Sequence, residues 1–266
     1  MPATDQVEAR ATSGMRVRSV PAVSRAIAIL RLLGRGQGPM TLKAISQELD
    51  LVTSTCLHIL RVLVDEGLVK VDSGSKRYSL STGMLALAKS VIDTNPFPAL
   101  AQPALDRISS SWNVTAIGVE VSGLEHMVVL ALSRSNAPIR LHVDVGSRFP
   151  ALISATGRLV AAYSELPDKE VESRFQALRW DNPPDIEAWR KDVQTVRRRG
   201  YSIDRGDYIS GIVLVAVPIL DSQSRITHSL VAAGFADQLT AQKTQSLVSD
   251  LQAEATGISN LLASRG

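Results

Sequence analysis

Polar side chains suited to contacting a charged surface gather between positions 53 and 77 of this chain. Hydroxyl residues come first, and a histidine and an arginine follow within two helical turns: Thr53, Ser54, Thr55, His58 and Arg61. Hydroxyls at a helix N-terminus can contact phosphates or base edges, supported by the helix dipole. Leu57, among them, can meet a thymine methyl or pack against a neighbour. Lys76 and Arg77 add two cations that suit the phosphates or minor groove of a nucleic acid.

Two helices must position this polar set. Thr41 is suited to cap a short helix over residues 42–49, and a turn at residues 50–52 leads to the second helix. Thr53 or Ser54 is expected to cap that second helix. Its buried side is predicted by apolar residues at the spacing i, i+3, i+4, i+7: Cys56, Ile59, Leu60 and Leu63. The polar set therefore occupies the opposite side.

A β-hairpin is predicted after the second helix, which is expected to stop at Gly67. Its strands cover residues 68–72 and 78–80, and Lys76 and Arg77 lie at the returning edge. A pair of helices is common in proteins that do not bind DNA, and its charged side chains are then simply exposed to solvent. The basic hairpin at this distance favours a winged helix-turn-helix, whose second helix enters the major groove. We therefore expect sequence-specific binding of double-stranded operator DNA.

Charge is distributed unevenly along the 266 residues. The first 85 residues contain 11 Lys and Arg against 7 Asp and Glu, whereas the remaining residues contain 18 against 19. The net charge of +3 therefore arises in the N-terminal third. A modestly basic small domain joined to a neutral larger one is consistent with a nucleic-acid-binding domain coupled to a domain of another function.

Several features bear on location and domain organisation. Residues 1–15 are polar and are expected to form a disordered tail rather than a signal peptide. The longest apolar run, residues 212–220, contains Pro218 and is too short to cross a bilayer, so we expect a cytoplasmic protein with no membrane partner. The single Cys56 excludes an intramolecular disulfide.

The chain is predicted to divide into a DNA-binding domain, a linker helix and a larger domain: residues 16–80, 81–95 and 96–266. The first of these opens with a helix over residues 19–33, and Arg18 and Arg25 can reach DNA from this flank. The linker helix is apolar, which is more typical of a dimer contact than of a free spacer.

The larger domain shows a mixed α/β pattern. Strand patterns occur at residues 114–121, 126–132, 139–143, 212–220 and 227–235. Helical patterns occur at residues 99–110, 155–164, 168–177, 184–199 and 241–263. Neighbouring strands at both ends of the domain, separated by long helical insertions, favour a mainly antiparallel sheet covered by helices. The predicted fold class is α+β.

An enzyme and a protein-interaction module are alternatives for this larger domain. His142 and Asp144 lie on one predicted strand face and could begin a metal site, but no catalytic or metal-binding motif is present. Asp204 and Asp207 resemble an acid pair, although they lie in a loop rich in glycine and charge. We expect no catalytic site, no metal and no cofactor.

Several separated segments resemble, in order, the IclR family of bacterial transcriptional regulators. They are SVPAVSRAIAILRLL, TLKAISQELDL, VGSRFPALISATGR and RRGYSIDRGDYISGIVLVAVPILD, and the resemblance extends from about Arg18 to Leu262. It implies a winged-helix domain, a linker helix and a C-terminal domain with a GAF-like or PAS-like sheet. It also implies homodimers or tetramers that bind operator DNA and respond to a small organic acid or aromatic effector.

The resemblance further implies an effector site at these residues: Ser154, Ala155, Thr156, Gly157, Asp204, Leu214, Val231 and Ala233. The first four match a helix start where backbone N–H groups meet an effector carboxylate, in agreement with the anion preference of helix N-termini. Asp204 matches an acidic position that polar effectors use, and Asp207 matches another acidic position of the same motif.

Three effector positions depart from the family pattern. Leu214 replaces a cysteine of some members, and Val231 and Ala233 replace serines of members that bind small hydroxy- or keto-acids. Fewer hydroxyl partners suit a less polar effector, so we predict an aromatic or partly apolar acid, or a close derivative. The alternative is that Val231 and Ala233 fill a strand core and the pocket has moved or been lost. The second helix of the helix-turn-helix also departs from the family pattern, because it has Leu57-His58 where many members have a His-Arg pair.

Overall fold

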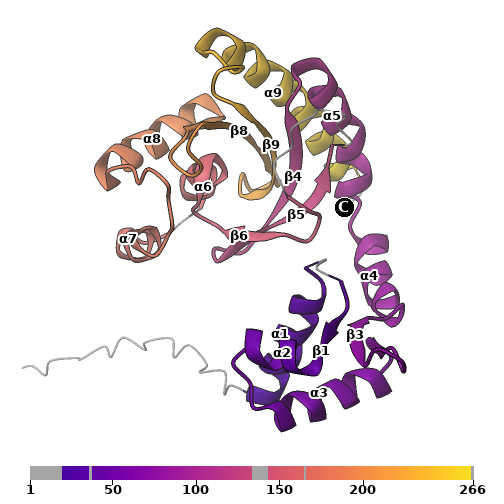
Figure 1. The fold of residues 1–266 in the computed structure, drawn as a ribbon. Helices are drawn as coiled ribbons and strands as arrows, with labels where there is room; N and C mark the ends of the chain where they lie inside the picture. The colour runs from indigo at the N-terminus through magenta and orange to yellow at the C-terminus, as the bar shows by residue number, and fades with distance from the viewer. Residues whose placement is uncertain (1–19, 36–37, 134–142, 165, 265–266) are drawn as a thin grey trace, which may run out of the picture. The chain divides into compact units, whose positions relative to one another are not determined.

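The computed structural model describes residues 20–35, 38–133, 143–164 and 166–264, and Figure 1 shows its ribbon. The chain divides into two compact units between Asp93 and Thr94, and each unit has a hydrophobic core of its own. Within the described ranges, no helix is both long and apolar enough to cross a membrane. Several features predicted from the sequence lie outside these ranges: the tail of residues 1–15, Arg18, His142, and residues 139–142 of a predicted strand.

Unit 1 combines helices with a small sheet. Its helices are α1 (Pro21–Leu33), α2 (Leu42–Glu48), α3 (Thr53–Asp65) and α4 (Gly83–Thr94), the last of which reaches the unit border. Its antiparallel strands are β1 (Met40–Thr41), β2 (Val69–Val71) and β3 (Arg77–Leu80), in the order β1-β3-β2. The apolar sides of α1, α2 and α3 meet in the core, where Ile29, Ile45, Cys56 and Leu60 are fully buried.

The two helix N-termini of the helix-turn-helix are stabilised differently. The Thr41 hydroxyl accepts a hydrogen bond of 3.2 Å from the Ala44 N–H, as an N-cap residue should. The cap predicted at Thr53 or Ser54 is wrong, because Val52 occupies the N-cap position of α3 and no side chain caps that helix. Thr53 and Ser54 already belong to the first turn, so their hydroxyls remain on its exposed surface.

The connection from α3 to the sheet follows a Schellman motif. Gly67 has φ +70°, and the Leu68 N–H donates to the Leu63 carbonyl oxygen at 2.9 Å. This left-handed turn ends the helix and starts β2. The sequence pattern does not predict β1, because two residues are too few to show alternation; Met40 pairs with Tyr78 of β3.

Unit 2 is built on a six-stranded sheet in which neighbouring strands are antiparallel, in the order β6-β5-β4-β9-β8-β7. The strands are β4 (Thr115–Ser122), β5 (His126–Leu132), β6 (Arg148–Pro150), β7 (Ser202–Arg205), β8 (Ile212–Leu220) and β9 (Ile226–Phe235). The helices are α5 (Phe97–Trp112), α6 (Ser154–Ala162), α7 (Asp168–Gln176), α8 (Ile186–Arg199) and α9 (Ala241–Ala263). The predicted α+β class with a mainly antiparallel sheet is confirmed.

Both faces of this sheet are covered by helices. The residues of α5 and α9 form one core with the sheet, and those of α6, α7 and α8 form another on the opposite face (Figure 1). Along β8, Val213 and Val215 pack in the first core, whereas Leu214 and Ala216 pack in the second. Burial on both faces explains why this strand is apolar at successive positions.

Candidate functional site

The exposed side of α3 is the first candidate site. It lies opposite the buried residues Cys56, Leu60 and Leu63. Thr53, Ser54, His58 and Arg61 are exposed there, and Thr55 and Leu57 are half-buried. The structure therefore gathers the predicted polar residues of this helix on one side. Most of their side chains are exposed, as contact with a DNA major groove requires.

The β2–β3 hairpin carries the two predicted cations. Asp72 shapes its turn, accepting the Ser75 N–H at 2.7 Å and the Ser75 hydroxyl at 2.6 Å. These hydrogen bonds lower the pKa of the Asp72 carboxyl, so it is ionised at neutral pH. Arg77 Nη1 donates to the Pro39 carbonyl oxygen at 2.9 Å and ties the hairpin to the segment before β1. Lys76 is exposed at the turn itself, with φ +54°.

The other predicted DNA contacts lie outside α3 and the hairpin. Arg25 is exposed on α1. Thr41 is half-buried and its hydroxyl caps α2, but a hydroxyl that accepts the Ala44 N–H can still donate its own proton.

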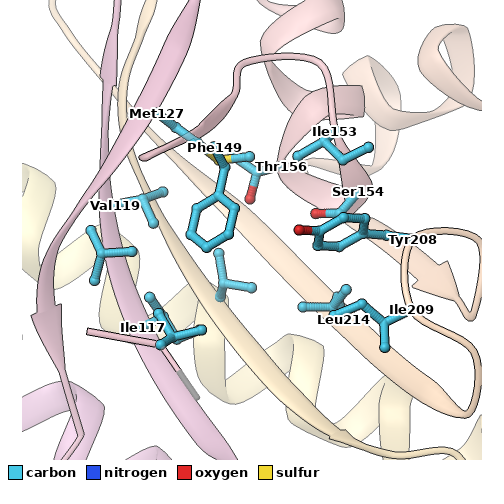
Figure 2. Close-up of a pocket in the computed structure, with 13 residues that line it drawn as sticks. Ile117, Val119, Met127, Phe149, Ile153, Ser154, Thr156, Tyr208, Ile209 and Leu214 are labelled. Carbon is cyan, nitrogen blue, oxygen red and sulfur yellow. The ribbon is translucent and has the colours of Figure 1, made fainter. Parts of the chain in front are cut away.

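A cavity in unit 2 is the second candidate site (Figure 2). It lies between the sheet and the start of α6, and its volume is about 220 Å³. The apolar wall comes from the strands, the segments flanking β6 and the loop after β7: Ile117, Val119, Met127, Val129, Val143, Phe149, Ile153, Ile209, Leu214 and Val231. A mostly apolar cavity with a few polar groups is the usual form of a small-molecule site.

Among the described residues, three hydroxyl groups supply the polar part of this cavity. Ser154 and Thr156 belong to the first turn of α6, and Tyr208 comes from the loop between β7 and β8. Figure 2 shows the three oxygens turned toward the interior. Burial raises the pKa of the Tyr208 phenol, and the charge of Asp181 adds to this, so the group is a protonated donor at neutral pH. Ser154 has φ +60°, a strained conformation of the kind found at binding sites.

Four of the eight predicted effector residues line the cavity: Ser154, Thr156, Leu214 and Val231. Ala155 and Ala233 lie outside it, buried in the adjoining core. Gly157 also lies outside, and its N–H already donates to the Ile153 carbonyl oxygen at 2.8 Å. A Cβ at Gly157 would come within 2.0 Å of the Leu152 carbonyl group. The glycine is therefore required for close packing of α6, and its amide is not available to a ligand.

Asp204 lies outside the cavity and is fully buried beside Arg158. Its carboxylate accepts the N–H groups of Gly206 at 3.1 Å and Asp207 at 2.9 Å, and lies 3.8 Å from Arg158 Nη1. Arg158, only 2% exposed, also binds the Asp207 carboxylate, and its Nε lies 3.5 Å from Asp192. Burial raises the pKa of Asp204, an effect that Arg158 opposes. Asp204 and Asp207 therefore compensate the charge of the buried Arg158 guanidinium.

Metal binding, one of the alternatives for the larger domain, needs several ligating side chains close together. In the part of the chain that the structure describes, no three His, Cys, Asp or Glu side chains are grouped so as to hold a metal ion. His228 is half-buried on β9 and stacks on Phe97 with 4.1 Å between ring centroids. Its packing is that of a core residue.

Two descriptions of known families match the sequence. "Bacterial transcriptional regulator IclR C-terminal" matches residues 89–260, and "IclR helix-turn-helix domain" matches residues 22–73. The chain belongs to the IclR family of bacterial transcriptional regulators. An IclR-type regulator combines a helix-turn-helix domain that binds DNA with a C-terminal domain that binds an effector, and the relatives of this chain are regulators rather than enzymes.

Individual relatives agree with this assignment. The probable transcriptional regulator SauR of Cupriavidus necator is 27% identical over 248 residues, covering 91% of this chain and 96% of the relative. An IclR transcriptional regulator from Alicyclobacillus acidocaldarius superposes with a TM-score of 0.78 at 27% identity, covering 91% and 99%. An IclR homologue from Microbacterium hydrocarbonoxydans, solved in complex with 4-hydroxybenzoate, gives a TM-score of 0.75 at 18% identity, covering 90% and 98%, and so shares the fold.

Sequence reasoning alone does not identify most of the cavity wall. The alternation of β4 and β5 is a usable signal, because it places Ile117 and Val119, and likewise Met127 and Val129, on one face of the sheet. Tyr208 gives no such signal, since it lies in a loop and only the fold of that loop brings it to the cavity.

Proposed function

We propose that this IclR-family regulator binds a near-palindromic operator as a homodimer or tetramer, and that a small aromatic acid, or a close derivative, occupies the cavity beside α6. The observation that carries the effector proposal is the composition of that cavity. In the described part of its wall, ten apolar side chains surround three hydroxyls, which suits a ring bearing one polar head. The IclR homologue solved with 4-hydroxybenzoate shows that this fold can hold such a compound, and so supports the proposal.

The DNA proposal rests on the exposed face of α3. His58 and Arg61 can reach base edges or phosphates once α3 lies in a major groove, and Lys76 can reach a neighbouring phosphate. A dimer would place two such helices about one helical turn apart, or a multiple of it, on a near-palindromic site. Affinity should fall steeply with salt, because neutralised phosphates release counterions.

Association of two copies is supported by exposed apolar side chains on unit 1. Leu85, Leu87 and Val91 of α4 are 67%, 58% and 61% exposed. On α1, Val23 and Ile27 are 55% and 41% exposed. Large apolar side chains so exposed on two helices of one small domain are typical of a protein interface. A second copy of this chain is the partner that a palindromic operator requires.

The mechanism needs only two arrangements of the DNA-binding units that bind the effector with different affinity. An effector preferring one arrangement shifts the population toward it, and operator affinity changes by the same coupling free energy.

The DNA proposal is tested by Arg61→Ala in a gel-shift titration with an operator selected by the full-length protein. Loss of a base or phosphate contact should weaken binding by about 1–3 kcal/mol. Lys169→Ala, which removes an exposed cation of unit 2, is the charge-matched control. Unchanged affinity of Arg61→Ala would remove this residue from the interface.

The effector proposal is tested by thermal unfolding and isothermal titration of the full-length protein with benzoate, 4-hydroxybenzoate and phenylacetate, and with glyoxylate and pyruvate. We expect binding and a rise in Tm only with the ring compounds, together with a change in operator affinity. Binding of the two- and three-carbon acids alone would refute the aromatic proposal.

A further inference from the structure

We propose that Tyr208 selects the effector by donating a hydrogen bond to an oxygen of its polar head, and that Arg158, Asp204 and Asp207 act by holding Tyr208 in place. This inference rests on the proposed function, since it assigns roles within the same cavity. It also reverses the expectation that Asp204 touches the effector.

The described wall of the cavity contains no charged side chain. The cation on α6, Arg158, lies beneath the loop after β7, where it faces the carboxylates of Asp204, Asp207 and Asp192. It is therefore unable to pair with a ligand without giving up these partners. Among the described residues, those that can hold the head of an effector are neutral donors, and this favours a ring with a carboxylate or carbonyl oxygen over a compound with several charges.

Tyr208 is the strongest of the three hydroxyl donors. A phenol is more acidic than the aliphatic hydroxyls of Ser154 and Thr156 and donates a stronger hydrogen bond. Ser154 and Thr156 both lie on the first turn of α6, whereas Tyr208 approaches from the loop after β7 (Figure 2). An oxygen placed among the three would meet donors from separate elements, which fixes its orientation.

The loop that carries Tyr208 is fixed from within by Asp204. One carboxylate oxygen accepts the N–H groups of Gly206 and Asp207, and the other lies 3.3 Å from the Tyr208 N–H. Asp207 is in turn bound to the Arg158 guanidinium. Asp204 is 0% exposed and both of its oxygens are engaged, so it stands behind the loop and away from the cavity.

The same loop is fixed from its other side by the segment before α8. The Asn182 N–H donates to the Asp207 carbonyl oxygen at 2.9 Å, and the Asn182 side-chain amide donates to the Gly206 carbonyl oxygen at 2.7 Å. The Ser210 N–H donates to Asp181 at 2.9 Å. With its backbone held on both sides, the loop presents Tyr208 and Ile209 to the cavity. The acids and Arg158 are thus positioning residues.

The first test is isothermal titration of the full-length wild type and Tyr208→Phe with benzoate and with toluene, which lacks the oxygen head. We expect Tyr208→Phe to bind benzoate about 10-fold more weakly and toluene equally well. Tyr201→Phe, which removes a hydroxyl outside the cavity, is the matched control and should change neither affinity. Equal benzoate affinity of wild type and Tyr208→Phe would overturn the selection by Tyr208.

The second test is a double-mutant cycle with Asp204→Asn. If Asp204 acts through Tyr208, Asp204→Asn weakens benzoate binding in the wild type but adds nothing in Tyr208→Phe. Additive losses would mean that Asp204 contacts the effector and would overturn the positioning role. Asp207→Asn, at a half-buried position of the same loop, serves in the same cycle if Asp204→Asn does not fold.

A ligand-free measurement separates this inference from the proposed function. The chain has four tyrosines, so ¹³Cζ-tyrosine NMR resolves each, with Tyr208→Phe giving the assignment. Asp204→Asn should shift the Tyr208 resonance and leave the other three in place. No shift would overturn the positioning role. Failure of the wild type to bind any ring compound would instead refute the proposed function and the selection by Tyr208, whatever the spectrum shows.

Discussion

The two faces of the six-stranded sheet in unit 2 are packed in different ways. On the face covered by α5 and α9, Phe97 is fully buried, stacks on His228 and lies so close to Gly118 that a Cβ there would sit 3.0 Å from its ring. On the face covered by α6, α7 and α8, the side chains leave a cavity of about 220 Å³. The first face is closely packed around Phe97 and is called the filled face, whereas the second keeps space for a ligand beside α6.

Strand β4 contributes to both faces in alternation. Ile117 and Val119 line the cavity, whereas Gly118 and Glu120 face the start of α5. Glu120 accepts a hydrogen bond of 3.1 Å from the Asn95 side chain, just after α4 ends. The filled face thus anchors the chain where unit 2 begins, while the other supplies the recognition surface. Substitutions should therefore cost stability on one face and change binding on the other.

The largest expected effect comes from deleting an aromatic ring on the filled face. Phe97→Ala should lower the free energy of unfolding of unit 2 by about 3–5 kcal/mol, because the rigid surroundings leave a void. Phe149→Ala, at the half-buried wall of the cavity, should cost much less. Urea unfolding followed by tryptophan fluorescence measures both, since all three tryptophans lie in unit 2. Equal losses would contradict the difference between the faces.

The filled face should also make unit 2 sensitive to acid. Burial lowers the pKa of His228 from 6.5 to about 4, so the folded state holds the neutral ring and binds fewer protons than the unfolded chain. Its contribution is present above pH 6.5 and is lost as the pH falls toward 4, to a total of about 3 kcal/mol. His228→Phe keeps a ring against Phe97 without the titrating nitrogen. Urea unfolding at several pH values should show a flatter profile for this variant.

Two substitutions that enlarge a valine, one on each face of the sheet, test directly how much free space each face contains. Val215→Phe overpacks the filled face and should destabilise unit 2 by about 1–3 kcal/mol. Val231→Phe, on the adjacent strand, grows into the cavity and should therefore destabilise unit 2 less than Val215→Phe does. It should abolish binding of ring compounds in a titration. Retained binding in Val231→Phe would show that the effector lies elsewhere.

The smallest effect concerns the helices that cover the two faces. Asp185 caps α8 by accepting the N–H groups of Glu187 and Ala188 at 3.0 Å each, so Asp185→Ala should cost about 1 kcal/mol. Thr240→Ala removes the cap of α9, whose hydrogen bond from the Lys243 N–H is longer, at 3.5 Å, and should cost less. Thermal unfolding monitored by tryptophan fluorescence ranks the two; the reverse order would contradict this interpretation.

Local patterns in the sequence determine much of the architecture. The apolar spacing that buries Cys56, Leu60 and Leu63 predicts α3 and its exposed polar side, because helix geometry alone decides which residues share a face. The bounds of β5 and β8 follow in the same way from continuous apolar runs that end at turns. The short strands β6 and β7 are not predicted, since three or four residues show no usable period; β2 and β3 are equally short, and the turn that joins them is what predicts them.

The composition of the cavity is only partly a property of the sequence. Leu214 and Val231 are apolar in any fold, and the family resemblance, which implies that they are effector positions, favours a less polar effector. That Ala233 and Gly157 pack in the core, while Tyr208 reaches the cavity from a loop, is decided by tertiary contacts. The contacts that hold the Tyr208 loop include those of Arg158, whose burial no local sequence pattern predicts. A guanidinium enters the interior only where separate segments supply carboxylates, and bringing such segments together is what the tertiary structure adds.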